Sequence, residues 1–118
     1  MKQLLLLSLL MFFTVPVAAQ GGNGETLASK FSYESFTLGT TTLPYRRADI
    51  NLTENKKPAL VLYLHGGTSR GNDNETQLKE KAVGVIYQHL TSHDMAAIFL
   101  VPQCPSGGGW TIYRLLCR

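Results

Sequence analysis

Two short apolar runs, separated by an amphipathic segment, constrain the fold of this chain more than any other feature. The first run covers residues 59–64 and ends at His65, and the second covers residues 95–101 and stops at Pro102. Each has the length of a strand, and the uninterrupted hydrophobicity of the first is typical of a strand buried on both faces. Strands connected through a helix pair in parallel. The sequence therefore predicts a βαβ unit.

The segment between the two runs has the pattern of a single helix. Asn74 can cap its first turn, with Gln77 as the reciprocal capping partner, so the helix should begin near Glu75 and end at residue 91 or 92. Apolar residues at helical spacing predict one buried face, which consists of Leu78, Ala82, Val85, Ile86 and Leu90.

An antiparallel hairpin is expected before this unit. Apolar residues within 31–38 and 43–52 flank the turn residues Gly39, Thr40 and Thr41. The expected fold class is therefore α/β, with an antiparallel hairpin followed by a βαβ unit with parallel strands.

The N-terminus has the features of a secretory signal peptide. Lys2 precedes an apolar run over residues 4–13, and the small residues Val17, Ala18 and Ala19 follow. That run is shorter than the roughly 20 residues of a membrane span. We expect residues 1–19 to be removed before Gln20 and the protein to be secreted or periplasmic, without a membrane span. The alternative is a retained N-terminal anchor.

The remaining chain is long enough for one modest domain. We expect a flexible lead-in at 20–30, a partial domain at 31–110 and an atypical tail at 111–118. Without Lys2, ten basic residues stand against eight scattered acidic ones, a balance that predicts no nucleic-acid partner. Cys104 and Cys117 would meet an oxidising compartment after export, but their spacing does not demand a disulfide, and we expect none.

A His-Gly-Gly sequence follows the first apolar run. Small residues at a strand end leave backbone N–H groups accessible, as an oxyanion hole requires, although a plain glycine turn would have the same composition. Here the sequence is His65, Gly66 and Gly67.

Several separated motifs together resemble a known family. They are Leu43-Pro44-Tyr45-Arg46, the run 58–64, the loop 65–74 (HGGTSRGNDN), Gln77-Leu78 and Pro102-Gln103-Cys104-Pro105. This arrangement, over about residues 43–110, resembles secreted bacterial α/β-hydrolases of the esterase and "predicted peptidase" group, which are related to polyhydroxybutyrate depolymerases and feruloyl esterases.

The resemblance implies the N-terminal part of an α/β-hydrolase fold, with the backbone N–H groups of Gly66, Gly67 and Thr68 in the oxyanion loop. In the family, the nucleophilic serine, the acid and the histidine come later in the chain. We therefore expect no catalytic residue here. The implied protein is a truncated exported serine esterase, inactive alone, whose parent hydrolyses a small-molecule or polymeric ester. The alternative is a small secreted, non-catalytic binding protein.

One sequence matches the nucleophile motif G-x-S-x-G literally, at residues 67–71. We reject Ser69 as the nucleophile, because three further residues separate this motif from the helix and Arg70 would crowd an elbow turn. A catalytic Ser69 would need His89 or His93 as its base and Asp73 or Asp94 as orienting acid.

The histidines favour structural roles. His65 is expected to orient its loop. His89 and His93 have the spacing of a zinc-protease pair, but Leu90 replaces the general-base glutamate, so we expect solvated residues at the helix end. No metal and no cofactor are predicted.

The tail 111–118 departs from the family pattern. A premature stop or a frameshift would produce it, and a short terminal helix over an exposed sheet face is the alternative. Since the missing half of the domain would leave a sheet edge and one face bare, we expect aggregation or partial unfolding.

Overall fold

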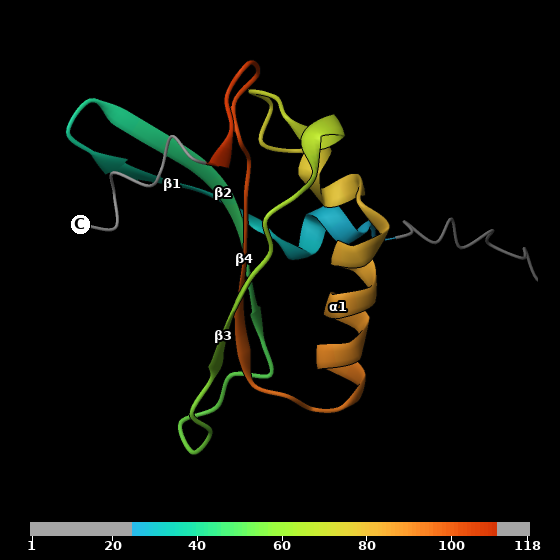
Figure 1. Ribbon diagram of the computed structural model, residues 1–118. Helices are drawn as coiled ribbons and strands as arrows, with labels where there is room; N and C mark the ends of the chain where they lie inside the picture. Colours follow the sequence, from blue (N-terminus) through green and yellow to red (C-terminus); the bar gives the residue numbers. More distant parts are fainter. Residues whose placement is uncertain (1–24, 111–118) are drawn as a thin grey trace, which may run out of the picture.

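A computed structural model describes residues 25–110, which form one mixed sheet with a helix on one of its faces (Figure 1). In chain order, the elements are η1 (Leu27–Lys30), β1 (Ser32–Leu38), β2 (Thr41–Ile50), β3 (Ala59–Leu62), η2 (Gly67–Ser69), η3 (Thr76–Lys79), α1 (Lys81–Ser92) and β4 (Ala97–Pro102). The η segments are 3₁₀ helices. The strand order across the sheet is β1-β2-β4-β3.

The sheet contains both strand pairs that the sequence predicts. β1 and β2 form an antiparallel hairpin around Gly39, whose φ of +59° suits glycine. β3 and β4 are parallel neighbours that α1 connects, with Val61 opposite Phe99. In addition, β4 lies between β2 and β3 and pairs antiparallel with β2. The last strand in the described chain is therefore central to the sheet.

The core lies between the sheet and α1. Phe99 is fully buried, and its ring centroid lies 5.6 Å from that of Phe31, which in turn lies 5.7 Å from Tyr87 of α1. The other buried apolar members include Ala48, Ile50, Leu78, Val83, Leu90, Ala97 and Val101. These contacts fix the helix on one side of the sheet.

The prediction of one helix beginning near Glu75 is wrong. The segment forms η3 and then α1, separated by Glu80, whose φ of −66° and ψ of 129° are extended. Asp73, not Asn74, caps the first turn, because its Oδ1 accepts the N–H groups of Glu75 and Thr76 at 3.0 and 3.1 Å. Asn74 has a left-handed φ of 51°, and its side chain is directed toward β2 instead.

The predicted helix face is also wrong in part. Leu78 and Leu90 are buried as expected, but Ala82 is exposed and Val85 has 56% of its surface exposed. Val83 is buried in their place, with Ile86 and Tyr87 packed against the core. The physical reason is the break at Glu80, which changes the phase of α1 relative to η3.

β3 does not have the burial on both faces that its sequence predicts. Val61 and Tyr63 pack against the core, whereas Leu60 and Leu62 are 70% and 58% exposed. β3 is one of the two edge strands, and within residues 25–110 the only α-helix lies on the opposite face (Figure 1). We call the side that carries Phe36, Leu43, Tyr45, Leu60, Leu62 and Leu100 the uncovered face.

The predicted lead-in 20–30 is wrong at its C-terminal end. Residues 27–30 form η1, and Leu27 and Ala28 pack against the core because apolar side chains lose water there. The expected signal peptide 1–19 and the tail 111–118, which includes Cys117, lie outside the described residues. In the part of the chain that is described, no helix has the length and hydropathy needed to cross a membrane.

Candidate functional site

The loops that follow β3 and β4 meet at the carboxyl ends of these two parallel strands. In open α/β sheets, ligands bind at this edge. The first loop begins at His65 and the second at Gln103, and both side chains are almost completely buried. A set of buried polar contacts connects the two loops.

His65 fixes the start of the first loop. Its Nε2 accepts the N–H of Cys104 at 2.9 Å, so its Nδ1 carries the proton and donates to the Gly66 carbonyl at 2.6 Å. The indole N–H of Trp110 donates to the His65 carbonyl at 2.9 Å. With both ring nitrogens engaged by the backbone of the two loops, His65 is placed to orient the loop, the role that the sequence predicts.

Gln103 connects the loops from the other side. Its Oε1 accepts the Asn74 N–H at 2.6 Å, and its Nε2 donates to Asp73 Oδ1 at 2.8 Å. The N–H of Gly71 donates to the Cys104 carbonyl at 3.0 Å. A Cβ atom on Gly71 would lie 2.8 Å from Gln103 Nε2, so only glycine fits here without displacement of its neighbour.

Asn74 and Arg46 fasten this loop to β2. The Asn74 amide donates to the Tyr45 carbonyl at 3.0 Å and accepts from Gln77 at 2.7 Å. The buried Arg46 guanidinium donates to the carbonyls of Phe31, Ala28 and Asn74 and lies 3.6 Å from the centroid of the Tyr33 ring. A buried charge requires such partners.

Asp73 acts as an ionised cap for η3. The Thr76 hydroxyl, the N–H groups of Glu75 and Thr76, and the Gln103 amide all donate to its carboxylate, and together they hold the pKa of Asp73 well below its usual range. These hydrogen bonds favour the charged form. The loop is therefore most strongly fixed when Asp73 is ionised.

Glu80 reaches the loop from the break between η3 and α1. Its Oε1 accepts the Ser69 hydroxyl at 2.6 Å and the Gly66 N–H at 3.1 Å, and its Oε2 accepts the Tyr63 hydroxyl. Partial burial alone would raise the pKa of Glu80, but hydrogen bonds from Ser69, Tyr63 and Gly66 outweigh it and lower this pKa. The bond to Glu80, together with burial, raises the pKa of Tyr63.

The residues predicted for the oxyanion loop lie at the surface of this polar network. Gly66, Gly67 and Thr68 are all exposed, and Gly67 and Thr68 open the η2 turn. The first N–H groups of a helical turn have no partner within that turn. The Gly66 N–H, by contrast, is engaged by Glu80.

Ser69 is held in a way that opposes nucleophilic use. It is buried, and its hydroxyl donates to the Glu80 carboxylate. His89 and His93 lie at the other end of α1, which at 1.5 Å per residue is about 18 Å long. The rings of these exposed histidines pack together, with centroids 4.2 Å apart. Within residues 25–110, no group of His, Cys, Asp and Glu could hold a metal ion.

The sequence analysis did not identify the roles of Asp73 and Glu80 in the loop. A local signal existed for Asp73, because an aspartate three residues before a threonine at a helix start is a capping pattern. Glu80 offered no local signal, since its partners Tyr63, Gly66 and Ser69 lie 17, 14 and 11 residues away in the sequence.

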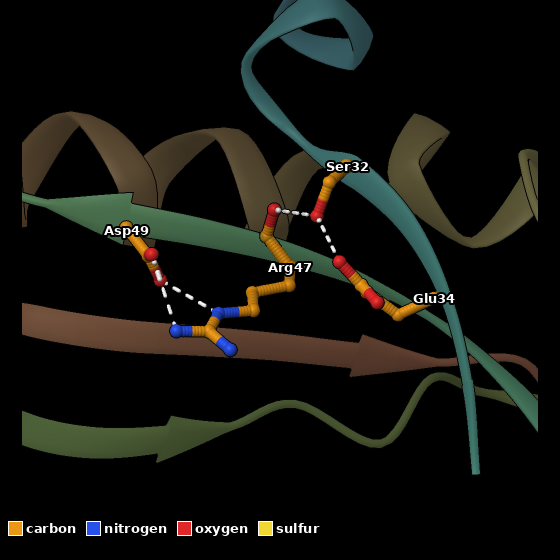
Figure 2. A network of polar contacts seen from close by, with 4 residues as sticks. All are labelled: Ser32, Glu34, Arg47 and Asp49. Carbon is orange, nitrogen blue, oxygen red and sulfur yellow. Dashed lines mark hydrogen bonds and ion pairs between the residues drawn. The ribbon is translucent and has the colours of Figure 1, made fainter.

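A second polar cluster lies on the hairpin, on the face away from α1 (Figure 2). Arg47 donates to Asp49 at 2.7 and 3.1 Å, and the Ser32 hydroxyl donates to Glu34 at 2.9 Å. Each charge is either compensated by a neighbour or exposed to water, where ion pairs are screened. This cluster offers no buried, unpaired group that would bind a ligand.

Comparison with known proteins finds similarity to solved structures. No protein-family model matches the chain, and no curated protein matches it. A solved structure described as the crystal structure of a thermostable esterase is similar, with a TM-score of 0.51 and 24% sequence identity. The match covers 70% of this chain and 23% of the esterase chain.

This similarity concerns the fold. The described sheet and helix match part of an esterase structure, and this chain spans about a quarter of that protein's length. A mixed sheet with one helix is compatible with a partial α/β fold.

Proposed function

We propose that this chain is the N-terminal part of an exported serine esterase of the α/β-hydrolase type, from the group related to polyhydroxybutyrate depolymerases and feruloyl esterases. One observation carries the proposal: a loop with exposed Gly66, Gly67 and Thr68 follows β3, in a sheet that matches part of an esterase. Truncation and export are parts of this proposal.

The proposed chemistry is hydrolysis of a small-molecule or polymeric ester. Attack on an ester carbonyl places negative charge on its oxygen, and fixed N–H donors stabilise that charge. The loop of this chain would supply such donors. In the proposed parent, the nucleophile, the acid and the base come from segments other than residues 25–110, because Ser69 is held by Glu80 and His65 by its backbone partners.

The experiment that tests this proposal is sequencing of the gene locus past the codon for Arg118. All three reading frames should be searched for an apolar run followed by G-x-S-x-G, with an acid and a histidine further on. Their presence is the expected result. Unrelated sequence in all frames would overturn the proposal in favour of a small secreted binding protein.

An activity assay separates this proposal from catalysis by Ser69. The chain and its Ser69→Ala variant should hydrolyse p-nitrophenyl acetate no faster than buffer does, because Ser69 has no histidine as a base. Turnover that disappears in Ser69→Ala would contradict the assignment of residues 67–71 to the oxyanion loop.

A further inference from the structure

We propose that Glu80 is the positioning residue of the oxyanion loop. Its carboxylate accepts the Gly66 N–H, so that the N–H groups of Gly67 and Thr68 are the donors for the substrate oxygen. This inference rests on the proposed function.

The backbone conformation at Glu80 explains how its carboxylate reaches the loop. Glu80 is extended and precedes α1, yet its carboxylate does not cap that helix. It turns toward the loop and accepts hydrogen bonds from three successive parts of the chain: the strand end at Tyr63, the loop start at Gly66 and the η2 turn at Ser69. One carboxylate thus fixes both ends of the segment 66–69.

The negative charge of Glu80 determines which backbone N–H groups of the loop remain available to a substrate oxyanion. An ionised carboxylate only accepts hydrogen bonds, so a Gly66 N–H that donates to it at 3.1 Å is already used. A second negative charge beside this carboxylate would also be repelled. A developing oxyanion is therefore better placed on the side of Gly67 and Thr68.

Another glutamate of the chain provides a matched control. Glu75 also accepts a hydrogen bond from a tyrosine hydroxyl, that of Tyr33, but the recorded contacts of its carboxylate include none to the loop 65–69. Glu75→Gln therefore removes a carboxylate–tyrosine pair of the same kind and leaves the proposed positioning contact intact.

The decisive measurement is the amide proton shift of Gly66 against pH, by NMR on the exported chain. The Gly66 N–H donates to the Glu80 carboxylate, and its carbonyl accepts from His65 Nδ1. We expect an acidic titration of the Gly66 shift in the wild-type chain and in Glu75→Gln, and its disappearance in Glu80→Gln. Persistence of this titration in Glu80→Gln would overturn the inference.

Hydrogen exchange provides the second readout. Loss of a hydrogen bond to a charged group costs about 1.5–3 kcal/mol, so Glu80→Ala should raise Gly66 amide exchange at least about tenfold relative to Val83 in α1. The Tyr63 phenol should also titrate at lower pH. If Glu80→Ala does not fold, Glu80→Gln provides the same comparison. Unchanged exchange and an unchanged Tyr63 titration would refute the positioning role.

The two proposals fail separately. Loss of the Gly66 titration in Glu80→Gln, combined with no elbow serine in the downstream DNA, would support the positioning contact of Glu80 and reject the esterase function. An elbow serine in the DNA, combined with an unaltered Gly66 titration, would keep the esterase and reject the role of Glu80.

Discussion

The two faces of the sheet differ in burial even where both carry apolar side chains. On the face under α1, Ala48, Phe99 and Val101 have at most 2% of their surface exposed. On the uncovered face, Phe36, Leu60 and Leu62 are 51–70% exposed, and Phe36, Leu43, Tyr45, Leu62, Leu100 and Pro102 line a shallow hollow. Both faces carry apolar residues on β3 and β4, whereas the hairpin part of the uncovered face carries the polar cluster of Figure 2. Of these two faces, the described chain covers only the one under α1.

This difference indicates that the sheet is suited to a further layer. An antiparallel sheet that faces water on one side normally carries polar residues there, whereas sheets in α/β domains are covered on both faces. Next to β3 and β4, the uncovered face is apolar, as it is in sheets that are covered on both faces. The match to the solved esterase covers 23% of that protein's chain.

The largest expected effect is the difference in stability between a substitution on each face. Phe99→Ala should lower the free energy of unfolding by about 3–5 kcal/mol, because it opens a cavity against Phe31. Leu60→Ala should change it by less than about 0.5 kcal/mol, since Leu60 is 70% exposed. Urea unfolding followed by circular dichroism measures both. Similar losses for the two variants would mean that the uncovered face is buried in solution.

A smaller effect is expected at the polar end of the sheet. Gly71→Ala should destabilise the chain by about 1–3 kcal/mol, because its Cβ would meet Gln103 Nε2 at 2.8 Å. Gly84→Ala is the control: its Cβ would make an ordinary contact, 3.6 Å from Leu27, and should stabilise α1 by up to about 1 kcal/mol.

A double variant sharpens this prediction. In a Gln103→Ala background, the additional cost of Gly71→Ala should fall below about 0.5 kcal/mol, because the clashing amide is gone. An undiminished cost would show that the loop excludes a side chain at Gly71 for another reason.

The smallest expected effect is a pH dependence from Asp73. Its pKa is lowered in the folded chain by Thr76, the N–H groups of Glu75 and Thr76, and Gln103. The stabilisation is therefore present above the unfolded pKa, about 3.9, and is lost as the pH falls toward the folded value. The stability advantage of the wild-type chain over Asp73→Asn should shrink below about pH 4.

Thr76→Val tests the cause of this effect. It removes the hydroxyl that contributes most to the lowered pKa of Asp73. The folded pKa of Asp73 should be less lowered in this variant, so its acid loss of stability should be smaller and should end at a higher pH than in the wild-type chain. Identical pH profiles for Asp73→Asn, Thr76→Val and the wild-type chain would contradict the capping role of Asp73.

The features predicted correctly from sequence were those that local patterns specify. The turn residues near Gly39 gave the hairpin, and the two apolar runs with a connecting helix gave the parallel pair of β3 and β4. The position of β4 between β2 and β3 depends on contacts between distant segments, which no local pattern records.

The errors came from tertiary contacts that override local preference. Glutamate favours a helix interior, yet Glu80 is extended because its carboxylate binds Tyr63, Gly66 and Ser69. For Leu60 and Leu62, hydrophobic side chains alone predicted burial, because a sequence pattern does not specify which segment covers a strand. At the candidate site, the sequence predicts an oxyanion loop at Gly66–Thr68 but does not predict the side chains that hold this loop.

Sedimentation velocity tests the uncovered face most directly. The chain should be compared with a Leu60→Glu/Leu62→Glu variant over a range of concentrations. We predict that the wild-type chain self-associates through its exposed apolar face, whereas the double variant is monomeric with the same circular dichroism spectrum. A wild-type chain that stays monomeric at all concentrations and unfolds in one sharp thermal transition would contradict the view that this sheet is one part of a larger hydrolase domain.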